Sequence, residues 1–153
     1  TLFRSFNNMM GQMLDDAKSF HSDLKFSSDI QGKIFIHADH DLIFQLMNNL
    51  LGNAIKYNQP GGSVAFNAKV AHQTLHFSFT NSTHLTSIGL NGRVFERFYR
   101  HREAIGHGVS HTSGAGLGLS LCQEIVKVHR GQIQLEVMSD QRVCVKCELP
   151  LAL

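Results

Sequence analysis

Residues 113–121 place three glycines where an amphipathic helix should begin: the segment reads SGAGLGLSL and contains Gly114, Gly116 and Gly118. Glycine is unfavourable inside a helix, so its repetition indicates that the backbone itself is needed here. A glycine-rich turn that opens a helix presents free N–H groups and the positive end of the helix dipole, and both attract phosphate oxygens. The alternative is a tight strand-to-helix turn. No Gly-Lys-Ser/Thr follows and the turn lies near the C-terminus, so neither a P-loop nor a first β-α dinucleotide unit fits.

A second set of polar residues shares one face of a helix predicted to end near Tyr57, within the segment FQLMNNLLGNAIKYNQPGG. Asn49, Asn53 and either Lys56 or Tyr57 are neighbours there, because residues three or four apart meet on a helix surface. Two adjacent carboxamide oxygens suit a hard cation such as Mg²⁺. Lys56 can meet a phosphate, and Tyr57 can stack on a base. The alternative is that both amides only cap or bridge buried backbone groups.

The cysteines and histidines favour structural interpretations. Cys144 and Cys147 form a C-x-x-C pair, but they lie in the alternating segment RVCVKCELPL, which predicts a strand with these two residues on opposite faces. Three cysteines without a secretory signal favour reduced thiols in a cytoplasmic setting. His107 and His111 are four apart, but intervening glycine argues against a helix, so we expect a mobile polar loop there.

The composition describes one ordinary globular domain over 1–153. Of the 153 residues, 42% are hydrophobic and 17% are charged, which supports one buried core and leaves no room for two domains. The net charge of +2 is spread along the chain without a Lys/Arg block, which argues against nucleic acid and membrane surfaces as partners. No apolar run approaches the roughly 18 residues that a bilayer span needs. We therefore expect no direct membrane contact by this domain, although its parent protein can be anchored in a membrane.

Hydrophobic spacing predicts three helices and several short strands. Apolar residues three and four apart predict helices over 2–20, from Asp39 or Asp41 to about Tyr57, and over about 117–129. Alternation predicts strands near 24–27, 33–37, 64–70, 75–79, 132–137 and 143–149, of which the third and fourth form a hairpin. Residues 82–113 show little periodicity and predict a long functional loop. Because strands and helices mix without strict β-α-β alternation, we expect an α+β fold with a mixed or antiparallel sheet and its helices on one face.

Three segments together carry a specific resemblance that spans nearly the whole chain. In order, they are NNLLGNAIKYNQPGG, RVFERFYR and GAGLGLSLCQEIVKVHRGQI. They resemble the catalytic, ATP-binding domain of bacterial two-component sensor histidine kinases, a branch of the gyrase, Hsp90 and MutL ATPase superfamily. The resemblance implies a two-layer α/β sandwich, the Bergerat fold, with a mixed sheet and three main helices on one face. ATP and Mg²⁺ would lie between the second helix and a flexible lid over about 82–113.

The resemblance implies roles for the matched residues of the second helix. Asn53 would coordinate the Mg²⁺ that bridges the ATP phosphates, and Asn49 would assist from the preceding turn. Lys56 would meet a phosphate, and Tyr57 would flank the adenine. Asn49 and Lys56 would also take part in the phosphoryl transfer itself.

The resemblance implies further roles near the lid. Three glycines would close over the triphosphate, namely Gly114, Gly116 and Gly118. Arg97 and Arg100 would bring positive charge to the reaction from the aromatic end of the lid, and Arg100 would also contact the nucleotide. Leu117 and Leu119, which alternate with the glycines and belong to the same nucleotide-binding segment, would anchor the third helix to the core.

One segment departs from the family pattern. Where the family usually has Asp-x-Gly-x-Gly, this chain reads NSTHL from Asn81 to Leu85. The family's aspartate accepts a hydrogen bond from the adenine amino group; Asn81 keeps an acceptor oxygen but lacks the charge, which makes the bond about half as strong. Side chains in place of glycine would also crowd the loop beneath the base. The alternative function is therefore a degenerate regulatory module with weak or no nucleotide binding.

The resemblance implies phosphoryl transfer from ATP to a histidine of a separate dimerisation domain. Hydrolases of the superfamily usually place a glutamate one turn before the magnesium asparagine; here that residue is Asn49, which cannot act as a base near neutral pH. A histidine nucleophile supplies its own lone pair, so the ATP-binding domain only positions and neutralises the phosphates. A serine kinase of the anti-sigma type shares the ATP segments but has no reason to carry FERFYR.

No His-Glu/Asp-x-x-x-Pro acceptor segment surrounds any of the ten histidines. We therefore expect the phosphoacceptor helices upstream of this chain. The implied partners are that dimerisation domain and a cognate response regulator.

Overall fold

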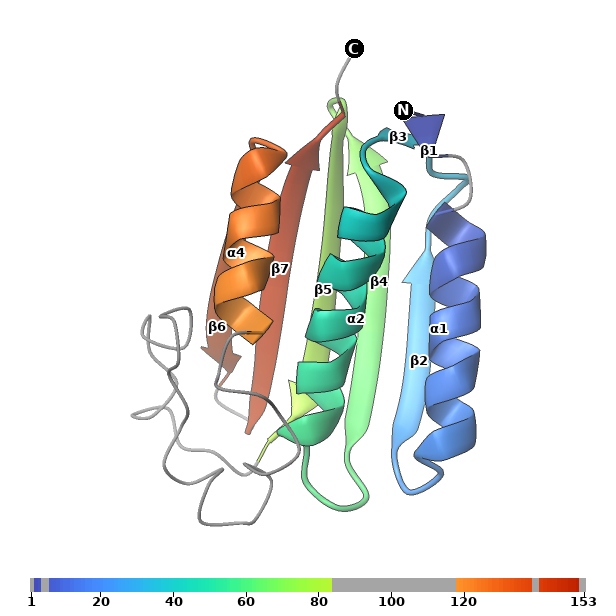
Figure 1. Ribbon diagram of the computed structural model, residues 1–153. Helices are drawn as coiled ribbons and strands as arrows, with labels where there is room; N and C mark the ends of the chain where they lie inside the picture. The colour runs from blue at the N-terminus through green and yellow to red at the C-terminus, as the bar shows by residue number, and fades with distance from the viewer. Residues whose placement is uncertain (1, 4–5, 84–117, 139–140, 152–153) are drawn as a thin grey trace.

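The computed structural model describes residues 2–3, 6–83, 118–138 and 141–151. Within these ranges, three helices cover one face of a five-stranded sheet (Figure 1). The helices are α1 (Phe6–Phe20), α2 (His40–Lys56) and α4 (Gly118–Val128). The strands are β1 (Leu2–Phe3), β2 (Lys25–Ile30), β3 (Ile36–His37), β4 (Ser63–Ala71), β5 (Thr74–Ser82), β6 (Gln132–Met138) and β7 (Arg142–Pro150).

The main sheet is mixed, with the strand order β2-β4-β5-β7-β6. β2 pairs in parallel with β4, and all other neighbours in this sheet are antiparallel. β1 and β3 form a separate antiparallel pair. A mixed sheet with three helices on one face confirms the predicted α+β sandwich.

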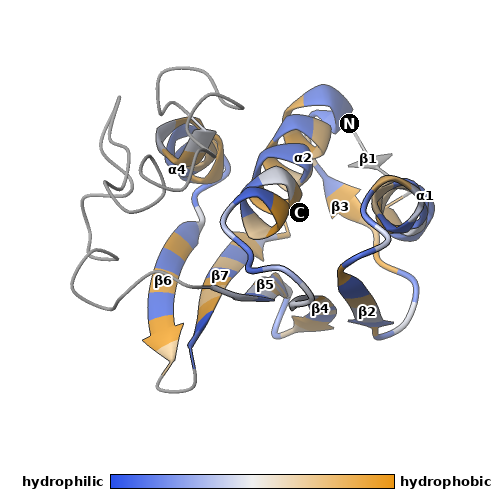
Figure 2. Cartoon of the chain, turned by 90° about the horizontal axis from the view of Figure 1, so that it is seen from below, coloured by the Kyte–Doolittle hydropathy of each residue, from blue (hydrophilic) through white to orange (hydrophobic). Residues whose placement is uncertain are grey.

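The core lies between the helices and the sheet. Figure 2, seen from below, shows the three helices over one face of the sheet. α1 contacts β2, α2 contacts β5, and α4 contacts β6 and β7. The apolar stripe of α2 is buried and consists of Ile43, Leu46, Met47, Leu50, Leu51 and Ala54. Burying one large aliphatic side chain contributes about 1.5–3 kcal/mol, so this stripe fixes α2 firmly over the centre of the sheet.

The predicted hairpin between β4 and β5 is present and explains the alternation seen in the sequence. Leu75, Phe77 and Phe79 of β5 are buried on the helix side, and the Phe79 ring centroid lies 4.8 Å from that of Phe66. The two residues of the turn, His72 and Gln73, have φ values of 52° and 59°. Positive φ at both residues is typical of the two-residue turns that fit the twist of the strands in a β-hairpin.

The N-terminal boundary of the first helix was predicted wrongly. Helical spacing extended the prediction back to Leu2, but Leu2 and Phe3 form β1, and α1 begins at Phe6. The backbone of β1 pairs with β3, in the register Leu2 opposite His37 and Phe3 opposite Ile36. This pairing with a distant segment overrides the local helical pattern.

The C-x-x-C prediction is confirmed by the register of β7. Cys147 lies opposite Phe77, whose side chain enters the core, whereas Cys144 lies opposite Thr80 on the other face. Burial raises the pKa of the Cys122 thiol to about 12, and burial likewise raises the pKa of Cys147. These two thiols therefore stay protonated near neutral pH and are poor nucleophiles.

Across the described ranges, no group of His, Cys, Asp or Glu side chains is arranged to hold a metal ion. None of the helices in these ranges combines the length and the apolar character needed to cross a membrane.

Candidate functional site

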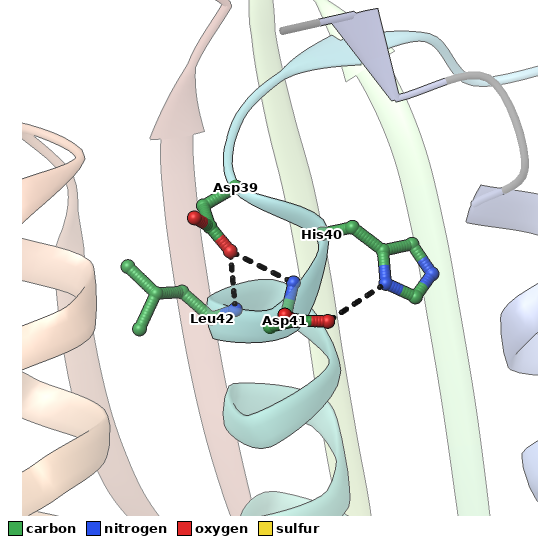
Figure 3. Close-up of polar contacts among 4 residues, drawn as sticks. All are labelled: Asp39, His40, Asp41 and Leu42. Atoms are coloured by element: carbon green, nitrogen blue, oxygen red, sulfur yellow. Dashed lines mark hydrogen bonds and ion pairs between the residues drawn. The ribbon is translucent and has the colours of Figure 1, made fainter.

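The helix α2 carries most of the predicted site residues, and its first turn is fixed by Asp39. The carboxylate of Asp39 accepts hydrogen bonds from the backbone N–H of Asp41 at 2.9 Å and of Leu42 at 3.1 Å (Figure 3). An aspartate in this position satisfies helix N–H groups that have no partner within the helix. Of the two predicted capping residues, Asp39 is therefore the N-cap.

Two flanks of α2 face different surroundings. Toward α1, a groove of about 680 Å³ is lined by apolar residues such as Met13 and Leu51 and by polar residues such as Gln12, Asp16 and Asn48. None of the predicted nucleotide-binding residues lines this groove. The other flank packs against α4 and carries the predicted site residues Asn49 and Asn53, which do not line the groove.

Asn49 and Asn53 are both partly exposed on that second flank. Within the described ranges, neither side chain donates or accepts a hydrogen bond. The alternative interpretation, in which these amides bridge buried backbone groups, is therefore disfavoured. Two carboxamides one turn apart, with no partners among the described residues, leave their oxygens available to a ligand.

The start of α4 brings Gly118, the last glycine of the predicted phosphate-binding segment, to Asn53. Gly118 is the first residue of α4, and a Cβ atom at this position would lie 3.6 Å from Asn53 Nδ2 and 3.9 Å from Asn53 Oδ1. Leu119 packs against the core, as predicted, and the Cys122 thiol lies 3.9 Å from the Leu46 carbonyl oxygen of α2. These contacts hold the N-terminal end of α4, which is the positive end of the helix dipole, beside the Asn53 amide.

Lys56 and Tyr57 lie together at the C-terminal end of α2. The Lys56 ammonium is 4.8 Å from the centre of the Tyr57 ring, within the range of a cation–π contact. Both side chains are partly exposed. The end of α2 thus places a positive charge and an aromatic face next to each other.

Asn81 is buried near the end of β5, with 4% of its surface exposed. It lies opposite Val64 of β4 and Val143 of β7, on the face of the sheet that the helices cover. Its Nδ2 donates to the backbone carbonyl of Ser82 at 2.8 Å. That bond fixes the amide so that its other atom, Oδ1, remains an acceptor.

Several sequence predictions lie outside the described residues. They concern the loop histidines His107 and His111, the lid residues Arg97 and Arg100, and the first part of the glycine segment, namely Gly114, Gly116 and Leu117. The predicted lid over 82–113 also falls there, except for its first two residues: Ser82 is the last residue of β5, and the N–H of Thr83 donates to Gln141 O at 3.0 Å.

Three residues near the site were not singled out by sequence reasoning: Asn58, Gly62 and Ser82. In the sequence, Asn58 and Gly62 follow the predicted end of the helix in a segment whose Pro-Gly-Gly indicates a turn, and Ser82 is the first residue of the predicted loop. The available signal was an asparagine placed directly after the polar helix face and followed by Pro-Gly-Gly.

Comparison of the chain with known proteins identifies its family. Residues 38–153 match the model of the histidine kinase-, DNA gyrase B- and HSP90-like ATPases. The signal transduction histidine-protein kinase BaeS of Escherichia coli (strain K12) is 34% identical over 128 residues, which are 84% of this chain and 27% of BaeS. This chain thus spans only about a quarter of the length of that curated relative.

Solved structures share the fold. The catalytic domain of the histidine kinase ThkA superimposes with a TM-score of 0.83 at 22% identity, over 99% of this chain and 95% of that domain. ThkA in complex with the response regulator protein TrrA gives a TM-score of 0.78 at 21% identity, over 99% of this chain and 42% of the matched chain. Together with the family match, these likenesses show that the chain belongs to the histidine kinase-, DNA gyrase B- and HSP90-like ATPase family, as an ATP-binding catalytic domain of the sensor histidine kinase type.

Proposed function

We propose that this domain binds ATP together with Mg²⁺ and presents the γ-phosphate to a histidine on a dimerisation domain elsewhere in its parent protein. The observation that carries the proposal is that Gly118 lies beside the Asn53 amide, so close that a Cβ atom at Gly118 would be 3.6 Å from Asn53 Nδ2. It joins the two segments that sequence reasoning assigned independently to phosphate and to the cation. A helix N-terminus and a free carboxamide at one point form a site for an anion with its metal ion.

The residues present fit a Mg²⁺ ion. Asn53 would supply a protein oxygen ligand and Asn49 would assist from one turn earlier, since neither side chain has another partner in the described ranges. Mg²⁺ usually keeps several waters and takes few protein ligands, so one or two amide oxygens beside the phosphates are enough. When bound, the ion would neutralise charge on the phosphate oxygens.

The base would lie between the end of α2 and the end of β5. Tyr57 would flank the adenine ring, and Lys56, held close to Tyr57, would bring its charge to the phosphates. Asn81 would accept from the adenine amino group through Oδ1, because its Nδ2 is engaged by Ser82 O. Guanine carries a carbonyl at that ring position, so this orientation favours ATP over GTP.

In the reaction, the imidazole lone pair of the acceptor histidine would attack the γ-phosphorus. A nitrogen–phosphorus bond forms, the bond to the β-γ bridging oxygen breaks, and ADP leaves. Asn49 cannot accept a proton from water at neutral pH, which disfavours hydrolysis. Positioning and charge neutralisation suffice for transfer to a nucleophile that already has a lone pair. Arg97, Arg100, Gly114, Gly116 and Leu117 remain proposed contributors from the lid side.

The setting of the parent protein is also part of the proposal. A sensor histidine kinase passes its phosphoryl group to a response regulator, and ThkA forms a complex with the response regulator TrrA. We place this domain in the cytoplasm, where ATP and such a regulator are available. The parent protein can be anchored in the inner membrane.

The direct test uses the full-length parent protein with γ-labelled ATP. We expect label on the protein that is lost in acid and retained in base, as a phosphoramidate requires, and we expect Asn53→Ala to abolish it. Asn48→Ala, on the flank of α2 that faces α1, is the matched control and should keep the label. Acid-stable label would contradict transfer to histidine. A folded wild-type protein without label and without ATP binding would support the regulatory-module alternative.

A further inference from the structure

Asn58, which follows α2 by two residues, is a buried side chain whose amide bonds three backbone groups. Its Nδ2 donates to Ala54 O at 3.1 Å and to Ser63 O at 2.9 Å, and its Oδ1 accepts from Gln59 N at 2.9 Å. The backbone N–H of Asn58 donates to Ile55 O at 3.2 Å, so the side chain takes over the donor role toward Ala54 O. The amide therefore completes the last turn of α2 and joins it to the first residue of β4.

The close packing around this amide depends on Gly62. A Cβ atom at Gly62 would overlap Asn58 Oδ1 and lie 2.9 Å from Ser82 Cβ. Contacts this short do not occur between real side chains, so only glycine lets the backbone pass between Asn58 and Ser82. The N–H of Gly62 donates to Gln59 O at 3.0 Å, which closes the same turn.

Ser82 extends the hydrogen bonds of Asn58 and Ser63 from β4 to β5. Its Oγ accepts from Ser63 N at 3.1 Å and lies 3.2 Å from Ser63 Oγ. Its backbone carbonyl accepts from Asn81 Nδ2 at 2.8 Å. Both backbone polar groups of Ser63 are thus bound by side chains, its carbonyl by Asn58 and its N–H by Ser82.

A continuous series of hydrogen bonds therefore runs from α2 to the end of β5. It begins at Ala54 O, directly after Asn53, and passes through Asn58, Ser63 and Ser82 to the Asn81 amide. Asn58 and Asn81 are both buried, so water does not readily replace a bond lost at either end. A shift of the last turn of α2 would be passed to Asn81, and the reverse holds as well.

We infer that Asn58 and Ser82 are positioning residues that hold the metal-binding end and the base-reading end of the nucleotide site in one fixed geometry. The inference rests on the proposed function, in which Asn53 binds Mg²⁺ and Asn81 reads the adenine. Neither Asn58 nor Ser82 needs to touch the nucleotide. A misplacement of about 1 Å far from the reacting atoms can reduce activity by a factor of about a hundred, so such residues are as consequential as direct contacts.

The test compares two ratios measured by calorimetry on the folded chain. The first is the affinity for ATP with Mg²⁺ divided by that with EDTA, which reports on the Asn53 end. The second is the affinity for Mg-ATP divided by that for Mg-GTP, which reports on the Asn81 end. We expect Ser82→Ala to lower the first ratio and Asn58→Ala to lower the second, each by about five- to tenfold. Ser82→Ala, which is next to Asn81, would then affect the Asn53 end of the site, and Asn58→Ala, which is close to Asn53, would affect the Asn81 end.

Ser78→Ala is the matched control for Ser82→Ala, since Ser78 lies on the same strand and the same face and makes no side-chain hydrogen bond within the described ranges. It should leave both ratios unchanged. If Asn58→Ala fails to fold, the ratio of ATP affinities with Mg²⁺ and with EDTA in Ser82→Ala tests the inference alone. Variants that bind ATP with both ratios unchanged, whatever their melting temperatures, would overturn this inference and leave the proposed function intact. Absence of ATP binding by the folded wild type would overturn both.

Discussion

Each end of α2 is capped by a side chain, one exposed to solvent and the other buried. At the first turn, Asp39 is exposed and accepts from the N–H groups of Asp41 and Leu42, which lie two and three residues away (Figure 3). After the last turn, Asn58 is 9% exposed and joins the helix to β4. The first cap depends on local sequence alone, whereas the second depends on tertiary structure. The end of the helix that carries Asn53, Lys56 and Tyr57 is the end that is tied to the sheet.

The largest expected effect comes from removing the tertiary cap. Asn58→Ala leaves two carbonyl oxygens and one N–H without their partner. A buried polar group without a partner costs about 1–3 kcal/mol, and partial access to water reduces the sum, so we expect a loss of about 3 kcal/mol in the free energy of unfolding. Urea denaturation followed by circular dichroism measures it, with exposed Asn48→Ala as the control. A loss of stability no larger than that of Asp39→Ala would contradict the claim that Asn58 contributes more to stability than the local cap does.

A somewhat smaller effect is expected from Gly62→Ala, because the added methyl group overlaps Asn58 Oδ1. Overpacking of this kind costs about 1–3 kcal/mol. In the Asn58→Ala background the overlap with Oδ1 is gone and only the close approaches to Ser82 Cβ and Gln59 O remain, so the two losses should be less than additive. A double-mutant cycle from four denaturation curves tests this, and full additivity would contradict the contact.

Loss of the local cap should be milder. Asp39→Ala removes two hydrogen bonds at an exposed helix start, for which about 1 kcal/mol is typical. We expect the ratio of ATP affinities with and without Mg²⁺, and the ratio of ATP to GTP affinity, to stay at their wild-type values. Calorimetry under conditions where the variant is fully folded decides the point. A change in either ratio as large as that of Asn58→Ala would show that the two caps are functionally equivalent.

The smallest effect is expected at Gly52, between the two caps, and it has the opposite sign. Gly52 is exposed in α2, and a Cβ atom there would meet no other atom within 4 Å. Gly52→Ala should therefore stabilise the chain by about 0.5–1 kcal/mol through the helix propensity of alanine. A higher urea midpoint with unchanged nucleotide affinity is the predicted result. A lower midpoint would indicate that Gly52 has a packing role in the groove toward α1.

The comparison also shows which features the sequence could predict. The Asp39 cap, the polar face of α2 and the hairpin of β4 and β5 follow from patterns that span a few residues. Local spacing therefore predicted the polar face and the hairpin correctly, and it narrowed the cap to Asp39 or Asp41, of which the structure selects Asp39. The opposite faces of Cys144 and Cys147 follow for the same reason, because strand alternation has a fixed period of two.

Other features could not be read locally. The pairing of Leu2 and Phe3 with β3 and the bonds of Asn58 to Ser63 depend on segments that meet only after folding. Asn58 looked like an ordinary turn residue, since asparagine after a helix has several common roles. The resemblance to a family identified the nucleotide-binding segments, but it did not reveal which side chains hold them together.

The central claim is that α2 and the start of α4 form one site for ATP and Mg²⁺, with Asn53 as the protein ligand of the metal ion. Calorimetric titration of ATP into the wild-type chain and into Asn53→Ala, each with Mg²⁺ and with EDTA, tests it most directly. The account predicts that Mg²⁺ tightens ATP binding to the wild type by at least about tenfold, or roughly 1.4 kcal/mol, and leaves binding to folded Asn53→Ala unchanged. Equal wild-type affinity in Mg²⁺ and EDTA, or an undiminished Mg²⁺ effect in Asn53→Ala, would contradict it.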